Sequence, residues 1–252
     1  MVWRGWGDSA QTILLLHGGS GSWIHWIRNI QVLSTRYTVW APDFPGMGES
    51  ADAPEPWTPQ IMADITQSGL QQILGERPVD VVGFSFGAMI GGFLAAGHRD
   101  RVRSLVLVDA AGTGVANDPG HKMRSWRNVP DPWQRKEIHR HNLAVFMLHD
   151  PARANPQAAE LVSFSVESDR LRNRQVSRTD ALLKILPQVS CPIFAIWGRE
   201  DVLFTRTRDQ LSAALQAAGV RSLYWLADAG HWAPFEKPAE FNAALLELLD
   251  SA

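Results

Sequence analysis

The sequence has little of what would cross-link the chain or draw it to a polyanion. Among its 252 residues there is a single cysteine, so an internal disulfide is excluded. Cys191 stands before a proline and an apolar run, and we expect it to be a buried packing residue. Basic and acidic residues nearly cancel, at 24 and 26 with a formal net charge of −2, so nothing global attracts nucleic acid or an anionic membrane. A small molecule is the expected partner.

Long apolar runs are missing as well. The longest early one, residues 13–16, is too short for a signal sequence or a membrane span, so we expect a cytoplasmic protein with no membrane partner. The chain also lacks His-Glu-x-x-His, Cys-x-x-Cys and carboxylate clusters with metal-ligand spacing, so we expect neither a metal nor another cofactor. A hydrophobic fraction of 45% and a charged fraction of 20% are ordinary for a folded protein, here expected as a monomer or homodimer.

Short apolar runs bounded by turn residues alternate with longer segments of helical spacing. This alternation is typical of a parallel sheet with crossover helices, whose strands are apolar on both faces. The predicted strands are residues 13–16, 38–41, 79–82, 105–108, 193–197 and 222–226. The predicted helices between and after them are residues 57–74, 86–98, 205–218 and 238–249.

No strand-like run appears between residues 113 and 189. Helix-start signals occur there instead, at Asp131-Pro132, Pro156 and Thr179-Asp180. We therefore predict an α/β core made of residues 1–112 and 190–252, interrupted by a helical cap, residues 113–189. Such a cap would lie as a lid over the carboxyl ends of the strands, where open α/β sheets bind ligands.

Residues 83–87 read Gly-Phe-Ser-Phe-Gly, directly after a predicted strand and before a small, apolar helix. A Gly-x-Ser-x-Gly in this context forms a sharp turn that lifts the serine oxygen clear of the sheet. Neighbours without side chains leave room for that turn. Ser85 is therefore the predicted nucleophile, and the N–H of Phe86, at the start of the helix, is predicted to stabilise an oxyanion.

A second glycine-rich loop, residues 17–22, follows the strand at 13–16. In this arrangement the loop supplies a second oxyanion donor, for which we name the N–H of Gly19 or Ser20. His17 is interpreted as a residue that orients the loop. The rival interpretation is a dinucleotide-binding loop with Asp43 as the acid that binds ribose, but Ile24 stands where the third glycine should be.

A serine hydroxyl needs a base to take its proton, and the base needs a third group to fix its tautomer. Asp201 follows the strand at 193–197 and His231 follows the strand at 222–226, in the chain order expected for such a serine. His231 is therefore the predicted general base and Asp201 the acid that orients it. Glu200, one residue away, and Asp109, at the end of the strand at 105–108, remain as alternative acids.

Together these elements resemble the α/β-hydrolase family over nearly the whole chain. The matching residues are His17-Gly18-Gly19, Asp43-x-Pro45-Gly46-x-Gly48-x-Ser50, Gly83-x-Ser85-x-Gly87, Asp201 and Gly230-His231. The resemblance implies an α/β-hydrolase fold, a mostly parallel eight-stranded sheet flanked by helices, with a first strand near residues 2–6 and the cap inserted late in the sheet. Haloalkane dehalogenases and epoxide hydrolases of this fold carry an aspartate where Ser85 stands, so hydrolysis through a seryl ester is implied.

The expected reaction is hydrolysis of a small, largely apolar carboxylic ester through an acyl-enzyme. The substrate pocket is predicted to be lined by aromatic side chains: Trp23, Trp126, Trp133, Phe146 and Trp232. A third interpretation, after the carbon–carbon bond hydrolase described below, is a non-catalytic receptor for a small ligand, which would keep the fold without turnover.

The C-terminal region also resembles the carbon–carbon bond hydrolases that cleave ketone substrates, the ring-fission products of aromatic degradation. The resemblance is carried by His231-Trp232-Ala233, Glu236 and Phe241-Asn242. It implies a cap arginine for a substrate carboxylate, which could be Arg170, Arg172 or Arg174. The chain departs from that subfamily at Phe84, where the subfamily usually has Asn.

Overall fold

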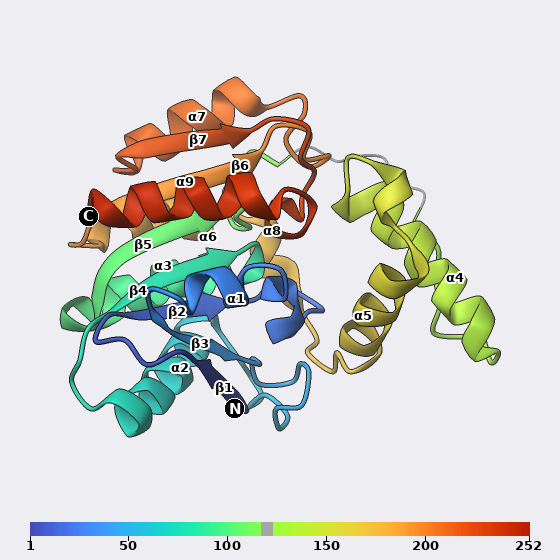
Figure 1. The fold of residues 1–252 in the computed structure, drawn as a ribbon, viewed down its shortest axis with the longest axis horizontal. Coiled ribbons are helices and arrows are strands. Elements are labelled where there is room, and N and C mark those ends of the chain that lie inside the picture. Colours follow the sequence, from blue (N-terminus) through green and yellow to red (C-terminus); the bar gives the residue numbers. More distant parts are fainter. Residues whose placement is uncertain (117–122) are drawn as a thin grey trace.

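The computed structural model describes residues 1–116 and 123–252, so residues 117–122 of the predicted cap lie outside the described residues. One sheet runs through the molecule in the strand order β1-β3-β2-β4-β5-β6-β7 (Figure 1). Neighbouring strands pair in parallel, except that β1 runs antiparallel to β3. The strands are β1 (Trp3–Trp6), β2 (Thr12–Leu16), β3 (Thr38–Pro42), β4 (Val79–Phe84), β5 (Val102–Val108), β6 (Ile193–Gly198) and β7 (Ser222–Leu226).

The sheet has one strand fewer than the family resemblance implies. The described residues form a 7-stranded sheet rather than an eight-stranded one. Before β2 there is a single strand, β1, and it pairs with the outer edge of β3, with Trp3 opposite Pro42 and Trp6 opposite Val39. Because β1 is itself the edge of the sheet, the described residues place no strand beyond it. Every strand predicted from the apolar runs is confirmed, with bounds that differ by a few residues.

Helices cover both faces of the sheet. The α-helices of the described residues are α1 (Ile30–Leu33), α2 (Pro59–Leu74), α3 (Phe86–Gly97), α4 (Pro132–Asn142), α5 (Pro156–Glu167), α6 (Ala181–Ile185), α7 (Arg208–Ala217), α8 (Ala233–Glu236) and α9 (Pro238–Asp250), and all but α4 and α5 pack on the sheet. Successive strand residues point to opposite faces, so Leu14 and Leu16 of β2 enter one core while Ile13 and Leu15 enter the other. Side chains of α2, α3, α6 and α7 complete the first core, and those of α1, α8 and α9 complete the second.

Helices α4 and α5 follow β5 in the chain and stand apart from the sheet (Figure 1). Asp131 caps α4 by accepting the N–H of Trp133, and Pro132 is the first helical residue. Helix α6 belongs to the core instead, because Leu182 fills the space that a side chain on Gly92 of α3 would need. Nowhere in the described residues is a helix both long enough and apolar enough to cross a membrane.

Candidate active site

Ser85 occupies a tight turn between β4 and α3. Its φ is +50°, in the left-handed region that residues with side chains rarely adopt. A Cβ on Gly83 would lie 2.5 Å from the Cα of Ala88, and one on Gly87 would lie 2.4 Å from the carbonyl oxygen of Leu16. The close packing of backbone around the turn therefore requires glycine on both sides of the serine.

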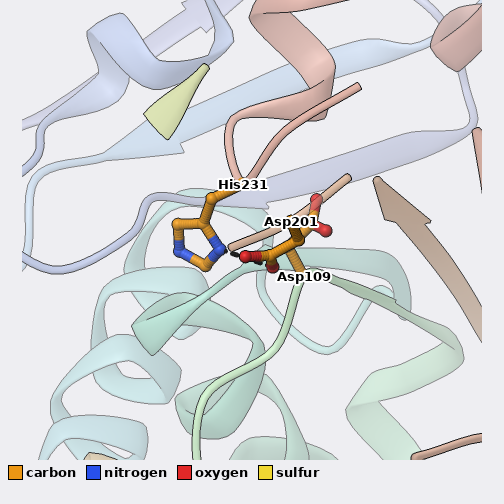
Figure 2. A group of neighbouring side chains, drawn as sticks. All are labelled: Asp109, Asp201 and His231. Carbon is orange, nitrogen blue, oxygen red and sulfur yellow. Dashed lines mark hydrogen bonds and ion pairs between the residues drawn. The ribbon is translucent and has the colours of Figure 1, made fainter. Parts of the chain in front are cut away.

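His231 contacts Ser85 on one side and Asp201 on the other. Its Nε2 lies 3.1 Å from the Oγ of Ser85. Its Nδ1 lies 2.8 Å from Oδ2 of Asp201, a contact that Figure 2 shows. Because the carboxylate is an acceptor, Nδ1 carries the proton and Nε2 is the free acceptor. Oδ1 of Asp201 accepts the N–H of Leu203 at 2.9 Å. His231 is 3% exposed and Asp201 is 1% exposed, so little water competes for these bonds.

The two alternative acids lie in different surroundings. Glu200 forms an ion pair with Arg208 at 3.8 Å, away from the imidazole. Asp109 is fully buried, and its carboxyl comes within 4.8 Å of the facing atoms of Asp201 and His231 (Figure 2). Burial in the first place, and then the neighbouring carboxylate of Asp201, raise the pKa of Asp109 well above its usual value.

The same three side chains, Asp109, Asp201 and His231, form a described group whose donor atoms are close enough to hold a metal ion. A cation there would have to displace the hydrogen bond between Nδ1 of His231 and Asp201.

Asp43, considered above as a ribose acid, is occupied by the protein itself. Its carboxylate accepts the N–H of Trp23 at 2.8 Å and that of Glu49 at 3.1 Å, which ties two loops together.

The loop after β2 is held by two buried histidines. His17 shares a hydrogen bond of 2.7 Å with the carbonyl of Gly18 through Nδ1, and its Nε2 accepts the N–H of Phe44 at 3.0 Å. His25 accepts the N–H of Gly18 at 3.1 Å through Nδ1. Burial is the main cause that lowers the pKa of each histidine, so both are neutral near pH 7. They orient the loop, and neither contacts Ser85.

Two backbone N–H groups beside Ser85 have no acceptor. Those of Phe86 and Gly19 make no hydrogen bond within the part of the chain that the structure describes. The two residues face each other, since a Cβ on Gly19 would lie 3.7 Å from the Cβ of Phe86. Ser20 adopts a positive φ of 52°, and its hydroxyl donates to Asp169 at 2.6 Å.

Arg174 lies beside the loop that carries Gly19 and Ser20. One guanidinium nitrogen, Nη2, donates to Asp169 at 2.7 Å and to the hydroxyl of Ser20 at 3.0 Å. The other, Nη1, is buried without a hydrogen-bond partner and lies 3.2 Å from the position of a Cβ on Gly19. Of the other two arginines considered above, Arg170 pairs with Asp52 at 2.6 Å and Arg172 is exposed. Only Arg174 of the three therefore presents a free donor to the site.

Ser85 opens into a cavity of about 600 Å³, which adjoins a second one of about 460 Å³. Of the predicted lining residues, Trp126 and Trp232 line the second cavity and Phe146 lines both. The remaining walls mix apolar side chains with arginines. The arginines that line one or both cavities are Arg124, Arg127, Arg174 and Arg178, and no acidic side chain of the described residues lines either.

The other two predicted lining residues, Trp23 and Trp133, lie away from both cavities. Trp23 packs on Trp6 with ring centroids 5.5 Å apart, so it covers the β1 edge of the sheet. Trp133 is 69% exposed. It precedes the lining residue Asn142 by nine positions on α4, which at about 100° per residue turns it to the opposite face of the helix.

A family model described as the alpha/beta hydrolase family matches residues 13–244. The chain belongs to the alpha/beta hydrolase family. The strand, turn and helix around Ser85 are the arrangement typical of this fold, so the family membership and the local geometry agree.

Individual relatives of this alpha/beta hydrolase have several activities. An acetoin-cleaving-system component from Cupriavidus necator, a dihydrolipoyllysine-residue acetyltransferase, is 28% identical over 95% of this chain, which spans only 63% of that protein. The 2-hydroxy-6-oxononadienedioate/2-hydroxy-6-oxononatrienedioate hydrolase 2 of Pseudomonas putida is 26% identical over 96% of this chain and 89% of its own. Among solved structures, a mutant meta-cleavage product hydrolase from Pseudomonas fluorescens IP01, complexed with acetates, superposes with a TM-score of 0.78 at 25% identity, covering 99% of this chain and 93% of its own.

One residue of this alpha/beta hydrolase that the sequence did not single out for the site is Glu236. Its carboxylate is fully buried and accepts the N–H groups of Gly230 at 2.7 Å, Asp150 at 2.7 Å and His149 at 2.9 Å. It thereby joins the loop that carries His231 to the chain that follows α4. The position after a Gly-His turn is visible in the sequence, but two of its three partners, His149 and Asp150, are more than eighty residues away and give no local signal.

Proposed function

We propose that this protein is a serine hydrolase in which Ser85 is the nucleophile, His231 the general base and Asp201 the acid that orients it. The observation that carries the proposal is the chain of contacts from Ser85 Oγ to His231 Nε2 at 3.1 Å and from His231 Nδ1 to Asp201 at 2.8 Å. A base that already faces the serine can take its proton as Oγ attacks a carbonyl carbon.

The oxyanion formed by that attack would be held by the N–H groups of Phe86 and Gly19. Both are unpaired, both border the cavity of Ser85, and Phe86 begins a helix of 12 residues, whose N-terminus favours negative charge. We prefer Gly19 to Ser20 as the second donor because Gly19 faces Phe86, whereas the hydroxyl of Ser20 is committed to Asp169.

The reaction is ester hydrolysis in two steps. Attack by Oγ and collapse of the intermediate expel an alcohol, which takes the proton from His231, and leave the acyl group on Ser85. Water, deprotonated by the same imidazole, then attacks the acyl-enzyme, and the carboxylic acid leaves while Ser85 regains its proton. The helices between β5 and β6 would cover this step as a lid, since Phe146 lies against His231 with ring centroids 5.4 Å apart.

The lining supports an ester that carries an acidic group on a largely apolar body. Trp126, Phe146 and Trp232 offer apolar surface, and Arg174 turns an unpaired buried donor toward Gly19. A substrate carboxylate would satisfy that donor with a charge-assisted hydrogen bond. The absence of acidic lining residues within the described part of the chain favours the same class of substrate.

A second candidate is hydrolysis of a carbon–carbon bond in a keto acid. It is favoured by Arg174 together with the Pseudomonas relatives, one of which is named as a hydrolase of two dioates and another was solved with acetates bound. Phe84 counts against it, because its ring packs 5.2 Å from the ring of His231 where the subfamily usually has a polar Asn.

A substrate panel with three variants tests both candidates. We expect the wild type to hydrolyse p-nitrophenyl monoesters of short dicarboxylic acids, and Ser85→Ala to lose all but a small residue of that rate. Arg174→Gln should raise KM for the acidic esters about tenfold or more while leaving neutral esters unchanged. Arg172→Gln, an exposed neighbour of the same type, is the matched control. Cleavage of a dienone acid without ester hydrolysis would replace the first candidate by the second, and ligand binding without any turnover would contradict both.

A further inference from the structure

Asp109 lies at the centre of the site but has no part in the mechanism above. It follows β5 directly, and its φ of +42° turns the backbone sharply so that the side chain points back toward β6. Oδ1 accepts the N–H of Gly198, the last residue of β6, at 2.8 Å. The residue is fully buried, and Figure 2 shows its carboxyl beside that of Asp201.

The second oxygen of Asp109 has no donor. Oδ2 is buried and unpaired within the described residues. A buried carboxylate oxygen without a donor is costly, and the cost grows when a second carboxylate lies next to it. Asp201 cannot relieve it by turning, because its two oxygens already accept from Leu203 and His231. A single proton between the two carboxyls would satisfy Oδ2 and remove the repulsion.

The charges around Asp109 also favour the protonated form of its carboxyl group. Burial is the largest cause that raises the pKa of Asp109, followed by the charge of Asp201, the hydrogen bond with Asp201 and the charge of Glu236. The hydrogen bond from Gly198 opposes them. His231 is the other titratable group of the cluster, and it is bound to Asp201 through Nδ1.

We propose that Asp109 is a positioning residue that stays protonated at neutral pH and donates its hydroxyl to Asp201. This inference rests on the proposed roles of Ser85, His231 and Asp201. The pair then carries one negative charge, and a donor from Asp109 fixes the plane of the Asp201 carboxylate so that Oδ2 faces His231. That one charge balances the imidazolium formed when His231 takes the proton of Ser85.

The alternative is that Asp109 is ionised and acts on His231 as a second negative charge. The two states respond differently to Asp109→Asn. Asparagine adopts positive φ as readily as aspartate, its amide oxygen can accept from Gly198 and its NH₂ can donate to Asp201, so it imitates the protonated acid. It imitates the ionised acid poorly, because it removes a negative charge from the cluster.

The measurement is the pH profile of the rate at which a fluorophosphonate modifies Ser85, which needs no knowledge of the substrate. For Asp109→Asn we expect a rate within about threefold of wild type and an acidic limb at the same pH. Asp109→Ala should react at least about tenfold more slowly, because it offers no donor to Asp201. Asp8→Asn, at an exposed carboxyl, is the control and should change nothing.

Two results with these variants would overturn the proposal. A shift of the acidic limb of Asp109→Asn by about one pH unit or more to lower pH would mean that a negative charge near the histidine had been removed. A wild-type rate in Asp109→Ala would mean that Asp109 positions nothing.

Infrared spectroscopy of the unmodified protein keeps the test independent of how the variants fold. We expect a neutral carboxylic acid band at pH 7 that disappears in both Asp109→Asn and Asp109→Ala, and its absence from the wild type would contradict the assigned proton. If the wild type showed the band but Ser85 did not react with the probe, the proposed function would fail and the positioning role with it, while the proton on Asp109 would stand.

Discussion

Removing the carboxylate of Glu236 should cost a large part of the stability of the fold. The side chain is fully buried, and three backbone N–H groups converge on it from Gly230, His149 and Asp150. A hydrogen bond to a charged group contributes about 1.5–3 kcal/mol to the free energy of unfolding. This contribution is lost when the acceptor is removed and the buried donor is left unpaired. The bonds from His149 and Asp150 are only part-buried, so water replaces some of the loss. For Glu236→Ala we therefore expect the free energy of unfolding to fall by about 3–6 kcal/mol.

Glu236→Gln separates the charge from the acceptor. Oε2 accepts from both Gly230 and His149, and Oε1 accepts from Asp150 alone. An amide with its oxygen at the Oε2 position keeps two of these bonds, so the expected loss is about 1.5–3 kcal/mol. The assay is urea unfolding at pH 7 followed by circular dichroism, with the m-value unchanged. Glu247→Ala, on the exposed face of α9, is the control and should shift stability by less than about 0.5 kcal/mol.

Since the stability of a domain is about 5–15 kcal/mol, the expected loss in the alanine variant is a large share of it. A loss below about 1 kcal/mol for Glu236→Ala, or equal losses for alanine and glutamine, would refute the reasoning that these hydrogen bonds hold the His231 loop.

Three further outcomes follow from groups that are buried or, as Cys191 is, partly buried. Burial raises the pKa of the Cys191 thiol to about 11. Iodoacetamide at pH 8 should therefore alkylate this thiol at least about a hundredfold more slowly than free cysteine. Rapid alkylation, measured by mass spectrometry, would contradict this. Because the pKa of Asp109 is raised in the folded state, that state binds the proton more tightly, and this contribution to stability is lost as pH rises from about 4 through the folded-state pKa. The stability of Asp109→Asn relative to wild type should therefore increase with pH in urea titrations, whereas a constant difference would contradict a raised pKa. Gly87→Ala would place a Cβ 2.4 Å from the carbonyl oxygen of Leu16. We therefore expect the free energy of unfolding to fall by about 1–3 kcal/mol in the same assay. A variant as stable as the wild type would show that the turn has more room.

Local pattern was enough to predict the six parallel strands β2 to β7 and the residues that meet around Ser85. Buried parallel strands are short apolar runs, and the strand, the turn at residues 83–87 and the helix are contiguous in sequence. The positions of Asp201 and His231 follow from the same rule, because residues that directly follow parallel strands gather at one edge of the sheet.

The direction of side chains was much less predictable. Trp126 and Trp133 are both aromatic residues of the same region, yet only Trp126 lines a cavity, because the phase of α4 turns Trp133 to solvent. Trp23 is in the right loop but packs on Trp6 of the edge strand.

Contacts between distant segments were beyond reach of any local pattern. Arg174 meets the hydroxyl of Ser20 across 154 positions, and Glu236 meets the N–H of His149 across 87. Asp109 and Asp201 look alike in sequence, since each follows a strand, and only the packing decides that Asp201 bonds to the imidazole while Asp109 bonds to the backbone of Gly198. The single strand before β2 likewise follows from the pairing of β1 with β3.

The most direct test of the central claim is the intact mass of the protein after brief treatment with a fluorophosphonate at pH 8, for the wild type and for Ser85→Ala. Only a serine whose proton is drawn away by a facing base is phosphonylated quickly, and Ser85 has His231 at 3.1 Å. We predict one adduct on the wild type and none on the variant. An equal adduct on Ser85→Ala, or no adduct on either protein, would contradict the assignment of Ser85 as the activated nucleophile.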